Sequence, residues 1–390
     1  MAKAKKTKGK APGAAKAARN KAPAKAAVPK GNAGPKPKVA KPATPAKPTK
    51  PAKPAAPAVK VPVAPAARAP APKAPAVAPK SGKPAATPAA SRRSGPTLPA
   101  GLAGAVRYDE PLAKHTTFRI GGPATVLFVP GDAESAAAAV AWAKSSGLPW
   151  LVLGMGSNVL VRDGGFRGLV LKIGKGLDEV TVKGATWTVG AGLPTPILAR
   201  RSAEAGLEGL QRLIGVPGSV GGGVFMNSGA HGQDFAGVLV SAQVLTPKGE
   251  MKTMLRQAIS FGYRRSGLDG HVVLGALLRF EEEDPTKLKN DMARVLKRRR
   301  AGTPFDQPCC GSVFRNPEAM TAGRLIDRCG LKGRRVGGAM ISPLHANYIV
   351  NKSGATADDV VKLIDIARTA VFKEFGHELQ LEVRVIGEAK

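Results

Sequence analysis

The pattern of apolar and polar positions predicts a strand, a helix and a second strand near the start of the apolar part of the chain. Residues 124–129 and 148–153 are apolar runs with the length of strands, and the alanine-rich residues 132–146 between them begin with acidic side chains, as helices often do. Short β-rich segments separated by glycine follow at residues 168–173, 179–182 and 186–189, and a helix is expected from about residue 195 to 205. This order of elements indicates an α+β fold.

The pattern further along predicts a hairpin and then a smaller α+β region. Residues 239–246 and 250–254 flank Pro-Lys-Gly and are expected to pair, with a short helix at 255–260, a strand at 271–281 and a charged helix at 285–300. The last part is expected to hold a helix at 321–329, a strand at 345–351, a helix at 356–375 and a final strand at 379–386. A domain boundary near Thr303 fits this division.

Two glycine-rich runs are candidates for binding a phosphorylated cofactor. Residues 214–230 read IGVPGSVGGGVFMNSGA, and residues 154–158 read GMGSN directly after an apolar stretch. Clustered glycines let the backbone approach a ligand closely and turn its N–H groups toward an anion, although ordinary turn glycines are the alternative. Neither run is the dinucleotide fingerprint G-x-G-x-x-G. We therefore expect two loops that converge on one extended cofactor, with contacts from Gly154, Gly156, Ser157, Asn158, Pro217, Gly218, Ser219, Gly221 and Gly222.

The first 100 residues have a composition that cannot build a hydrophobic core. They contain 23 lysines and arginines and 21 of the 34 prolines, with no acidic and no aromatic residue. This composition is typical of a disordered cationic tail that binds polyanions, nucleic acids among them, without reading their sequence. The rest of the chain has 37 basic and 27 acidic residues, so most of the formal net charge of +33 lies in the tail.

The hydropathy, cysteine and histidine patterns argue against a membrane span, secretion and a metal site. No apolar run has the roughly 20 residues needed to span a bilayer, and the N-terminus lacks the apolar segment of a signal peptide, so a cytoplasmic location is expected. The odd set Cys309, Cys310 and Cys329 lacks metal-ligand spacing and is interpreted as free thiols. The five histidines are scattered, and no metal site is predicted.

Three polar segments are candidates for chemistry, because each lies beside glycine or within an apolar run. They are residues 263–266, residues 311–317 and Glu382. Each also has an ordinary interpretation: a paired surface arginine, a turn serine, or a glutamate on the solvent side of a strand. Gly311-Ser312 is not a hydrolase nucleophile elbow, because Val and Phe follow it.

Eight motifs in order resemble the UDP-N-acetylenolpyruvoylglucosamine reductase family of peptidoglycan precursor synthesis. They are TTFRIGG, GMGSN, IGVPGSVGGGVFMNSGA, GYRRS, GSVFRNP, AGRLIDRCGLKG, HANYIVN and LEVRVIG, and they cover about residues 108–387. The resemblance implies a PCMH/vanillyl-alcohol-oxidase-type FAD-binding domain at residues 108–284 and a small C-terminal α+β substrate domain at 303–390. The tail at residues 1–100 lies outside the resemblance. Residues 280–304 have no room for the tyrosine-bearing insertion of the longer subclass, so the chain resembles the shorter one.

The resemblance also implies a reaction and its residues. The implied activity is that of a UDP-N-acetylmuramate dehydrogenase: NADPH reduces noncovalently bound FAD, hydride passes to C3 of the enolpyruvyl ether, and C2 is then protonated. Arg264 matches the catalytic arginine of the family, Ser312 the proton donor and Glu382 the catalytic glutamate. Tyr263 and Asn316 match substrate contacts. The sequence departs from the family at Arg315, where lysine is common, and at Cys309-Cys310, where a small residue is usual before Gly311.

Two other functions stay open at this stage. One is another PCMH-type flavin oxidoreductase that acts on an alcohol or a sugar. The other is a polyanion-binding protein with an inactive flavin domain.

Overall fold

The computed structural model describes residues 59–60 and 96–390. The expected tail at residues 1–100 falls mostly outside these described residues. Leu98, at the end of that range, is buried in the main hydrophobic core, and its N–H donates to the Tyr108 hydroxyl over 3.2 Å. Ordered packing therefore begins before Tyr108, the first aromatic residue of the chain.

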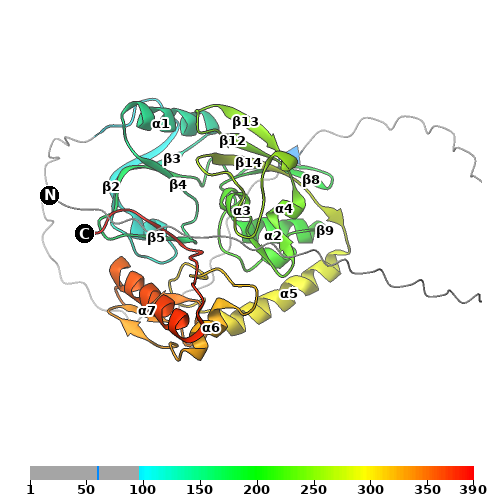
Figure 1. The fold of residues 1–390 in the computed structure, drawn as a ribbon. Helices are drawn as coiled ribbons and strands as arrows, with labels where there is room; N and C mark the ends of the chain where they lie inside the picture. Colours follow the sequence, from blue (N-terminus) through cyan, green and yellow to red (C-terminus); the bar gives the residue numbers. More distant parts are fainter. Residues whose placement is uncertain (1–58, 61–95) are drawn as a thin grey trace, which may run out of the picture. The chain divides into compact units, whose positions relative to one another are not determined.

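A four-stranded sheet forms the first layer, and it contains the predicted strand-helix-strand arrangement. Its order is β2-β3-β6-β4, and β6 lies between β3 and β4 and is parallel to both. Asp132 caps helix α1 by accepting a hydrogen bond from the Ser135 N–H over 2.7 Å. Helix α1 lies against this sheet (Figure 1), and its buried alanines belong to the same hydrophobic core as Val126, Phe128 and Leu169 of the sheet. The bounds are β2 (Gly104–Pro111), β3 (Pro123–Pro130), α1 (Ala133–Ser145), β4 (Trp150–Leu153) and β6 (Phe166–Lys172).

A second, six-stranded sheet has the order β1-β7-β8-β14-β12-β13, and its paired strands are antiparallel. The predicted hairpin is confirmed, since β12 and β13 pair over five positions. Strand β14 is buried along most of its length, with helix α3 against it. The bounds are β1 (Val59–Lys60), β7 (Val180–Lys183), β8 (Thr186–Gly190), β12 (Leu239–Leu245), β13 (Met251–Leu255) and β14 (Val272–Arg279).

The central glycine-rich run contains a helix, α3 (Val220–Met226), where a loop was expected. Glycine is a poor helix former, but tertiary packing overrides its propensity. A Cβ on Gly223 would lie 2.2 Å from the Phe235 ring, and one on Gly221 would lie 2.8 Å from the Ala191 side chain. The glycines therefore let this helix lie directly against its neighbours.

The C-terminal region is the predicted small α+β unit, with shorter strands than expected. Helix α7 begins with a capping box, in which Thr356 and Asp359 exchange hydrogen bonds. Only the second half of the expected strand at 345–351 is extended as β18, and the final strand contains only residues 384–386 as β19. The bounds are α6 (Ala322–Arg328), β16 (Arg335–Val336), β17 (Ala339–Ile341), β18 (Ile349–Asn351), α7 (Ala357–Phe375) and β19 (Arg384–Ile386).

The C-terminal segment returns from α7 to the first part of the chain (Figure 1). Strand β19 pairs in parallel with β5 (Val159–Val161), and Phe118 and Leu160 pack in the same hydrophobic core as α6 and α7. This return places residues 379–383 beside the glycine-rich segments.

The remaining elements are short, apart from α2 and α5. The helix expected at 255–260 is a single 3-10 turn, η3. Within the described residues, no helix is long and apolar enough to cross a membrane. The bounds are η1 (Leu112–His115), α2 (Thr195–Glu204), β9 (Leu207–Glu208), η2 (Gln211–Leu213), β10 (Gly229–Ala230), β11 (Gln233–Asp234), α4 (Phe235–Val238), η3 (Arg256–Ala258), β15 (Glu281–Glu282) and α5 (Pro285–Gly302).

Candidate active site

One cavity of about 890 Å³ brings together both glycine-rich segments and all three candidate polar segments. Its volume lies within the range of about 300–1,000 Å³ typical of ligand and cofactor sites. Arg264, Ser312, Asn316 and Glu382 line it, together with every residue predicted to contact the cofactor. Tyr263 does not line the cavity and is 52% exposed.

The two glycine-rich segments are joined directly, as two converging loops require. The Ser157 hydroxyl donates to the Pro217 carbonyl over 3.2 Å. Gly156 has φ +64°, and a Cβ there would lie 2.4 Å from the His115 carbonyl oxygen. Gly218 has φ +133°, a conformation that side chains rarely adopt. A Cβ on Gly218 would lie 3.3 Å from the Ser157 Oγ, so both glycines let the backbone pack closely against neighbouring segments of the protein.

Arg264 and Glu382 form an ion pair at the cavity wall, although they are 118 positions apart in the sequence. The Arg264 Nε donates to Glu382 Oε1 over 2.7 Å, and the two side chains are 24% and 13% exposed. Among the described residues, no hydrogen bond from the Arg264 Nη groups is found. The carboxylate thus orients the guanidinium through Nε, and the Nη fork remains available to a ligand.

A tight turn presents Arg264 to this partner. Gly262 and Arg265 exchange backbone hydrogen bonds across the turn, and Arg264 has φ +57°. A left-handed non-glycine residue is strained, and such strain concentrates at functional sites. The guanidinium lies 4.9 Å from the centre of the Tyr263 ring, so Tyr263 supports Arg264 from outside the cavity.

Ser312 lies on a loop that buried hydrogen bonds hold in place. The Asn347 side chain accepts from the Phe314 N–H over 2.9 Å and donates to the Phe314 carbonyl over 2.8 Å, while the Val313 N–H donates to the Asn347 carbonyl. The Glu382 N–H in turn donates to the Val313 carbonyl over 2.8 Å. These contacts fix the Ser312 and Glu382 segments against each other.

Asn316 has a structural role in addition to lining the cavity. Its Oδ1 accepts a hydrogen bond from the Ala322 N–H over 3.1 Å at the start of α6. The amide oxygen is therefore engaged within the protein, and the Nδ2 group is the part of the side chain left for a ligand.

Burial disfavours the thiolate form of the adjacent thiols. All three cysteines are free, as predicted. Burial raises the pKa of the Cys309 thiol, and burial followed by the Cys309 charge raises the pKa of Cys310 further. A thiol kept protonated in this way is a poor nucleophile. No cluster of three or more potential metal ligands is found in the part of the chain that the structure describes.

Sequence reasoning missed a positively charged group at the cavity. Arg298 and Arg299 of α5 line it, as do His231, His345 and Tyr348. Burial lowers the pKa of His231, and the charges of Arg298 and Arg299 lower it further. Burial also lowers the pKa of His345, with Lys332 as the next cause. The run of basic residues in the helix predicted at 285–300 was the available signal, but its direction toward the cavity depends on tertiary packing.

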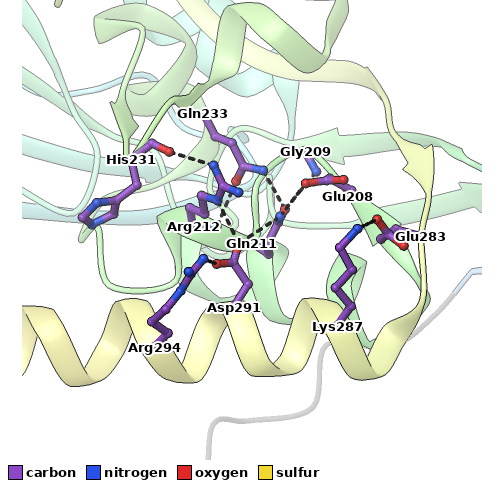
Figure 2. Close-up of polar contacts among 10 residues, drawn as sticks. All are labelled: Glu208, Gly209, Gln211, Arg212, His231, Gln233, Glu283, Lys287, Asp291 and Arg294. Atoms are coloured by element: carbon purple, nitrogen blue, oxygen red, sulfur yellow. Dashed lines mark hydrogen bonds and ion pairs between the residues drawn. The ribbon is translucent and has the colours of Figure 1, made fainter.

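A polar network fastens α5 to the hairpin that carries His231 (Figure 2). Arg212 donates to Asp291 of α5 over 2.8 Å and to the His231 carbonyl over 3.0 Å. Burial alone would raise the pKa of Asp291, but hydrogen bonds from Arg212 and Arg294 hold it below its usual value. Asp291 and Arg298 are seven residues, or about two helical turns, apart and so share one side of α5. The network thereby sets the position of Arg298 at the cavity.

The fold and the cavity define a flavoprotein oxidoreductase with a separate C-terminal domain. Residues 124–254 match the family model of an FAD binding domain. Residues 303–386 match the model described as UDP-N-acetylenolpyruvoylglucosamine reductase, C-terminal domain. The predicted α+β architecture, with a PCMH-type FAD-binding domain and a smaller C-terminal domain, is confirmed.

Individual relatives specify the family. The UDP-N-acetylenolpyruvoylglucosamine reductase of Halalkalibacterium halodurans is 43% identical over 288 residues, which are 73% of this chain and 95% of that protein. The Bacillus subtilis enzyme of the same name is 41% identical over 287 residues, 73% of this chain and 95% of that protein. The crystal structure of the Thermus caldophilus enzyme (MurB) superposes with a TM-score of 0.63 at 35% identity, covering 73% of this chain and all of that one. The chain belongs to the UDP-N-acetylenolpyruvoylglucosamine reductase family.

The residues of the cavity fit FAD. An extended dinucleotide needs close backbone approach along its diphosphate. Gly222 lines the cavity, and the nearest atom to a Cβ there would be the Ser219 Oγ, 3.7 Å away, so the glycine-rich backbone leaves room for such a molecule at this point. The carbonyl groups of Gly154 and Gly156 accept hydrogen bonds from Lys172 and Thr117, respectively, so they are held by the protein and not turned to a ligand. FAD and NADPH are the cofactors of this family and of this chain.

Proposed function

We propose that Arg264, Ser312 and Glu382 carry the reduction of UDP-N-acetylenolpyruvoylglucosamine to UDP-N-acetylmuramate in this chain. One observation supports this assignment above the others. Three segments remote in sequence meet at one wall of the cavity, where Glu382 bonds to Arg264 through its side chain and to Val313 through its backbone. The same cavity contains both glycine-rich segments. An alcohol or sugar oxidase is not favoured, because the relatives are named as reductases of the enolpyruvyl sugar.

Arg264 stabilises the negative charge that develops on the substrate. FAD held by the glycine-rich segments and reduced by NADPH would supply the hydride that C3 of the enolpyruvyl ether receives. Charge then builds at C2 and in the adjoining carboxylate, and the Nη fork of Arg264 can hold that carboxylate in a bidentate way. Glu382 acts on the guanidinium through the 2.7 Å bond to Nε, which sets the direction of the fork.

Ser312 completes the reaction by giving its hydroxyl proton to C2. A hydroxyl group is a weak acid in water, but a carbanion next to it is a strong base, and a donor held within hydrogen-bond reach suffices. Gly311, with φ +81°, and the Asn347 contacts hold the serine in place. Because the donor is fixed on one side of the cavity, protonation occurs on one face of C2.

Arg298, Arg299 and His231 bind the anionic diphosphate of the UDP-sugar. Burial lowers the pKa of His231, and the charges of Arg298 and Arg299 beside it lower that pKa further. An anion between them relieves the repulsion between those charges. The Nδ2 group of Asn316 is a further substrate contact. Tyr263, which was also expected to contact the substrate, lies outside the cavity and acts through Arg264, whose guanidinium lies 4.9 Å from the centre of its ring. We place the FAD-binding domain at residues 108–284 and the substrate domain at 303–390, with α5 as the connection.

Flavin content and the two half-reactions test this function. The purified chain should be yellow, should release the flavin on heating, and should be bleached by NADPH. Addition of UDP-N-acetylenolpyruvoylglucosamine without oxygen should restore the colour. Gly218→Val is the loss-of-binding variant for this test. Valine is strained at φ +133° and its side chain would lie close to Ser157, so the glycine-rich segments should no longer hold the flavin and the variant should be isolated colourless. A colourless wild-type protein would contradict the assignment. So would a reduced flavin that UDP-N-acetylenolpyruvoylglucosamine does not reoxidise, but that oxygen or the oxidised product of an alcohol does.

We also propose that the basic tail binds polyanions and that the protein is cytoplasmic. Its 23 positive charges have no acidic counterpart, and release of counterions drives such association. A protein that begins at residue 96 keeps Leu98 in the core and should retain reductase activity. Its affinity for duplex DNA, measured by fluorescence anisotropy, should be largely lost, and the affinity of the whole chain should fall steeply with salt. Equal DNA affinity of the whole and shortened chains would refute this assignment.

A further inference from the structure

Thr117 lies between the glycine-rich segment at residues 154–158 and the loop at residues 308–314 that carries Ser312 (the Ser312 loop). Its N–H donates to the Gly156 carbonyl over 3.1 Å, and its hydroxyl donates to the Cys309 carbonyl over 2.7 Å. The hydroxyl also lies 3.3 Å from the Gly156 carbonyl. Because a hydroxyl has one proton to donate, the shorter contact to Cys309 takes that proton, and the backbone N–H serves Gly156. Thr117 therefore joins the two loops directly.

The two loops meet at the wall of the main cavity. Gly156 and Ser157 line the cavity from one loop, and Gly311 and Ser312 line it from the other. A Cβ on Gly311 would lie 3.9 Å from the Ser157 carbonyl oxygen, so the two backbones lie side by side there. Thr117 itself does not line this cavity. It therefore acts on the cavity only through the loops that it joins.

The turn that carries Thr117 is anchored to the C-terminal domain. Phe118 is fully buried, in the same hydrophobic core as Phe314 of the Ser312 loop. The Asn351 side chain donates to the Phe118 carbonyl over 3.2 Å. Because the turn is fixed on this side, a change in the order of residues 154–158 reaches the Ser312 loop through Thr117.

The segment at residues 154–158 is suited to report whether the cofactor site is occupied. It lines the cavity and includes two glycines, and glycine has more backbone freedom to lose on ordering than other residues have. Order that a ligand brings to one segment can be passed to a second segment that shares its hydrogen bonds. The contacts of Thr117 to Gly156 and Cys309 provide such a connection.

We propose that Thr117 is a positioning residue that couples occupancy of the flavin site to the placement of the Ser312 hydroxyl. Residues 154–158 become fixed when FAD is bound, and Thr117 passes that constraint to the Cys309 carbonyl. Ser312 is then held where C2 of the substrate is protonated. The Ser312 loop is thus most ordered when the cofactor that must first supply the hydride is present. The proposal rests on the role of Ser312 proposed above.

Thr117→Val tests this proposal, because it removes the hydroxyl but keeps the N–H bond to Gly156 and the branched side chain. At saturating FAD, flavin reduction by NADPH should keep its rate. The limiting rate of reoxidation by UDP-N-acetylenolpyruvoylglucosamine should fall by about 10-fold, since a displacement of about 1 Å at a reacting group can cost ~10²-fold. The half-saturating substrate concentration should stay unchanged, because Arg264 and Asn316 are left in place. Thr117→Ser retains a hydroxyl and should restore the rate.

Amide hydrogen exchange measures the coupling without turnover. The Val313 and Phe314 N–H groups, which bond to Asn347, report the order of the Ser312 loop. In the wild type, addition of FAD to the flavin-free chain should slow the exchange of both groups. In Thr117→Val, FAD should still bind but should leave their exchange unchanged.

Thr116→Val is the matched control, because it removes the hydrogen bond that the Thr116 hydroxyl donates to the Ile120 carbonyl over 3.0 Å, within the same turn. It should keep both the reoxidation rate and the effect of FAD on exchange. Equal defects in Thr116→Val and Thr117→Val would mean that the turn matters for packing alone. A persistent FAD effect in Thr117→Val would overturn the coupling, and the absence of any FAD effect in the wild type would overturn it whatever the variants do. Normal reoxidation in Ser312→Ala would instead overturn the proposed role of Ser312 and leave the exchange measurement to decide the coupling.

Discussion

In Ser312→Ala, NADPH should bleach the flavin at a near wild-type rate, whereas reoxidation by UDP-N-acetylenolpyruvoylglucosamine should slow by about 10²–10⁴-fold, the usual effect of losing a positioned general acid. The reason is that hydride transfer from NADPH involves no proton at C2. The Ser312 loop is held by backbone groups and by Asn347, not by the serine hydroxyl, so the variant should fold and bind flavin normally. Rapid mixing of prereduced enzyme with substrate measures the step directly.

Ser145→Ala is the matched control for this variant. Ser145 is exposed on α1, where its hydroxyl donates to the Trp142 carbonyl of the same helix, and both half-reactions should keep their rates. Normal flavin reoxidation in Ser312→Ala would remove the serine from the mechanism. A defect confined to NADPH oxidation would assign Ser312 to the nicotinamide instead.

The elements that the sequence predicted well are those in which one local signal decides the structure. Helix α1 has an aspartate cap and an alanine face, α7 has a capping box, and the β12–β13 hairpin has a Pro-Lys-Gly turn. Each of these signals acts within a few residues, and the bounds agree within a few positions.

The predictions failed where tertiary contacts outweigh local preference. Residues 220–226 look like a loop because of their glycines, yet Phe235 and Ala191 require small residues on a helix at this point. Asn347 lies in an apolar run that suggests a strand, but as a buried amide it needs partners, which it finds on Phe314. No pattern within these segments identifies the neighbours.

The candidate site shows the same difference between what local signals predict and what tertiary contacts decide. Motifs identified Arg264, Ser312 and Glu382 as residues, and all three line the cavity. Their arrangement was not predictable, because the Glu382 contact to Arg264 spans 118 positions. Arg298, Arg299 and Tyr348 were missed for a similar reason: a charged helix and an apolar strand have ordinary structural interpretations until their neighbours are known.

Arg264→Ala should slow reoxidation of the reduced flavin by the substrate and also weaken substrate binding. The loss of one group aimed at developing negative charge costs about 3–4 kcal/mol, or roughly 10²–10³-fold in rate. Binding weakens as well because the guanidinium meets the carboxylate in the ground state and in the transition state. The rate of flavin reoxidation as a function of substrate concentration separates the two effects, since binding sets the half-saturating concentration and chemistry sets the limiting rate.

Arg265→Ala is the control, because it shows whether the effect belongs to Arg264 or to its neighbour in the same turn. Arg265 is exposed, does not line the cavity and makes no ion pair with Glu382, so its loss should change neither parameter. Glu382→Gln retains an acceptor for the Arg264 Nε but removes the negative charge, so the guanidinium is oriented less strongly and an intermediate loss of limiting rate is expected. If Arg265→Ala carried the defect and Arg264→Ala did not, the turn would present the other arginine to the substrate, and the Arg264 to Glu382 pair would be a structural contact only.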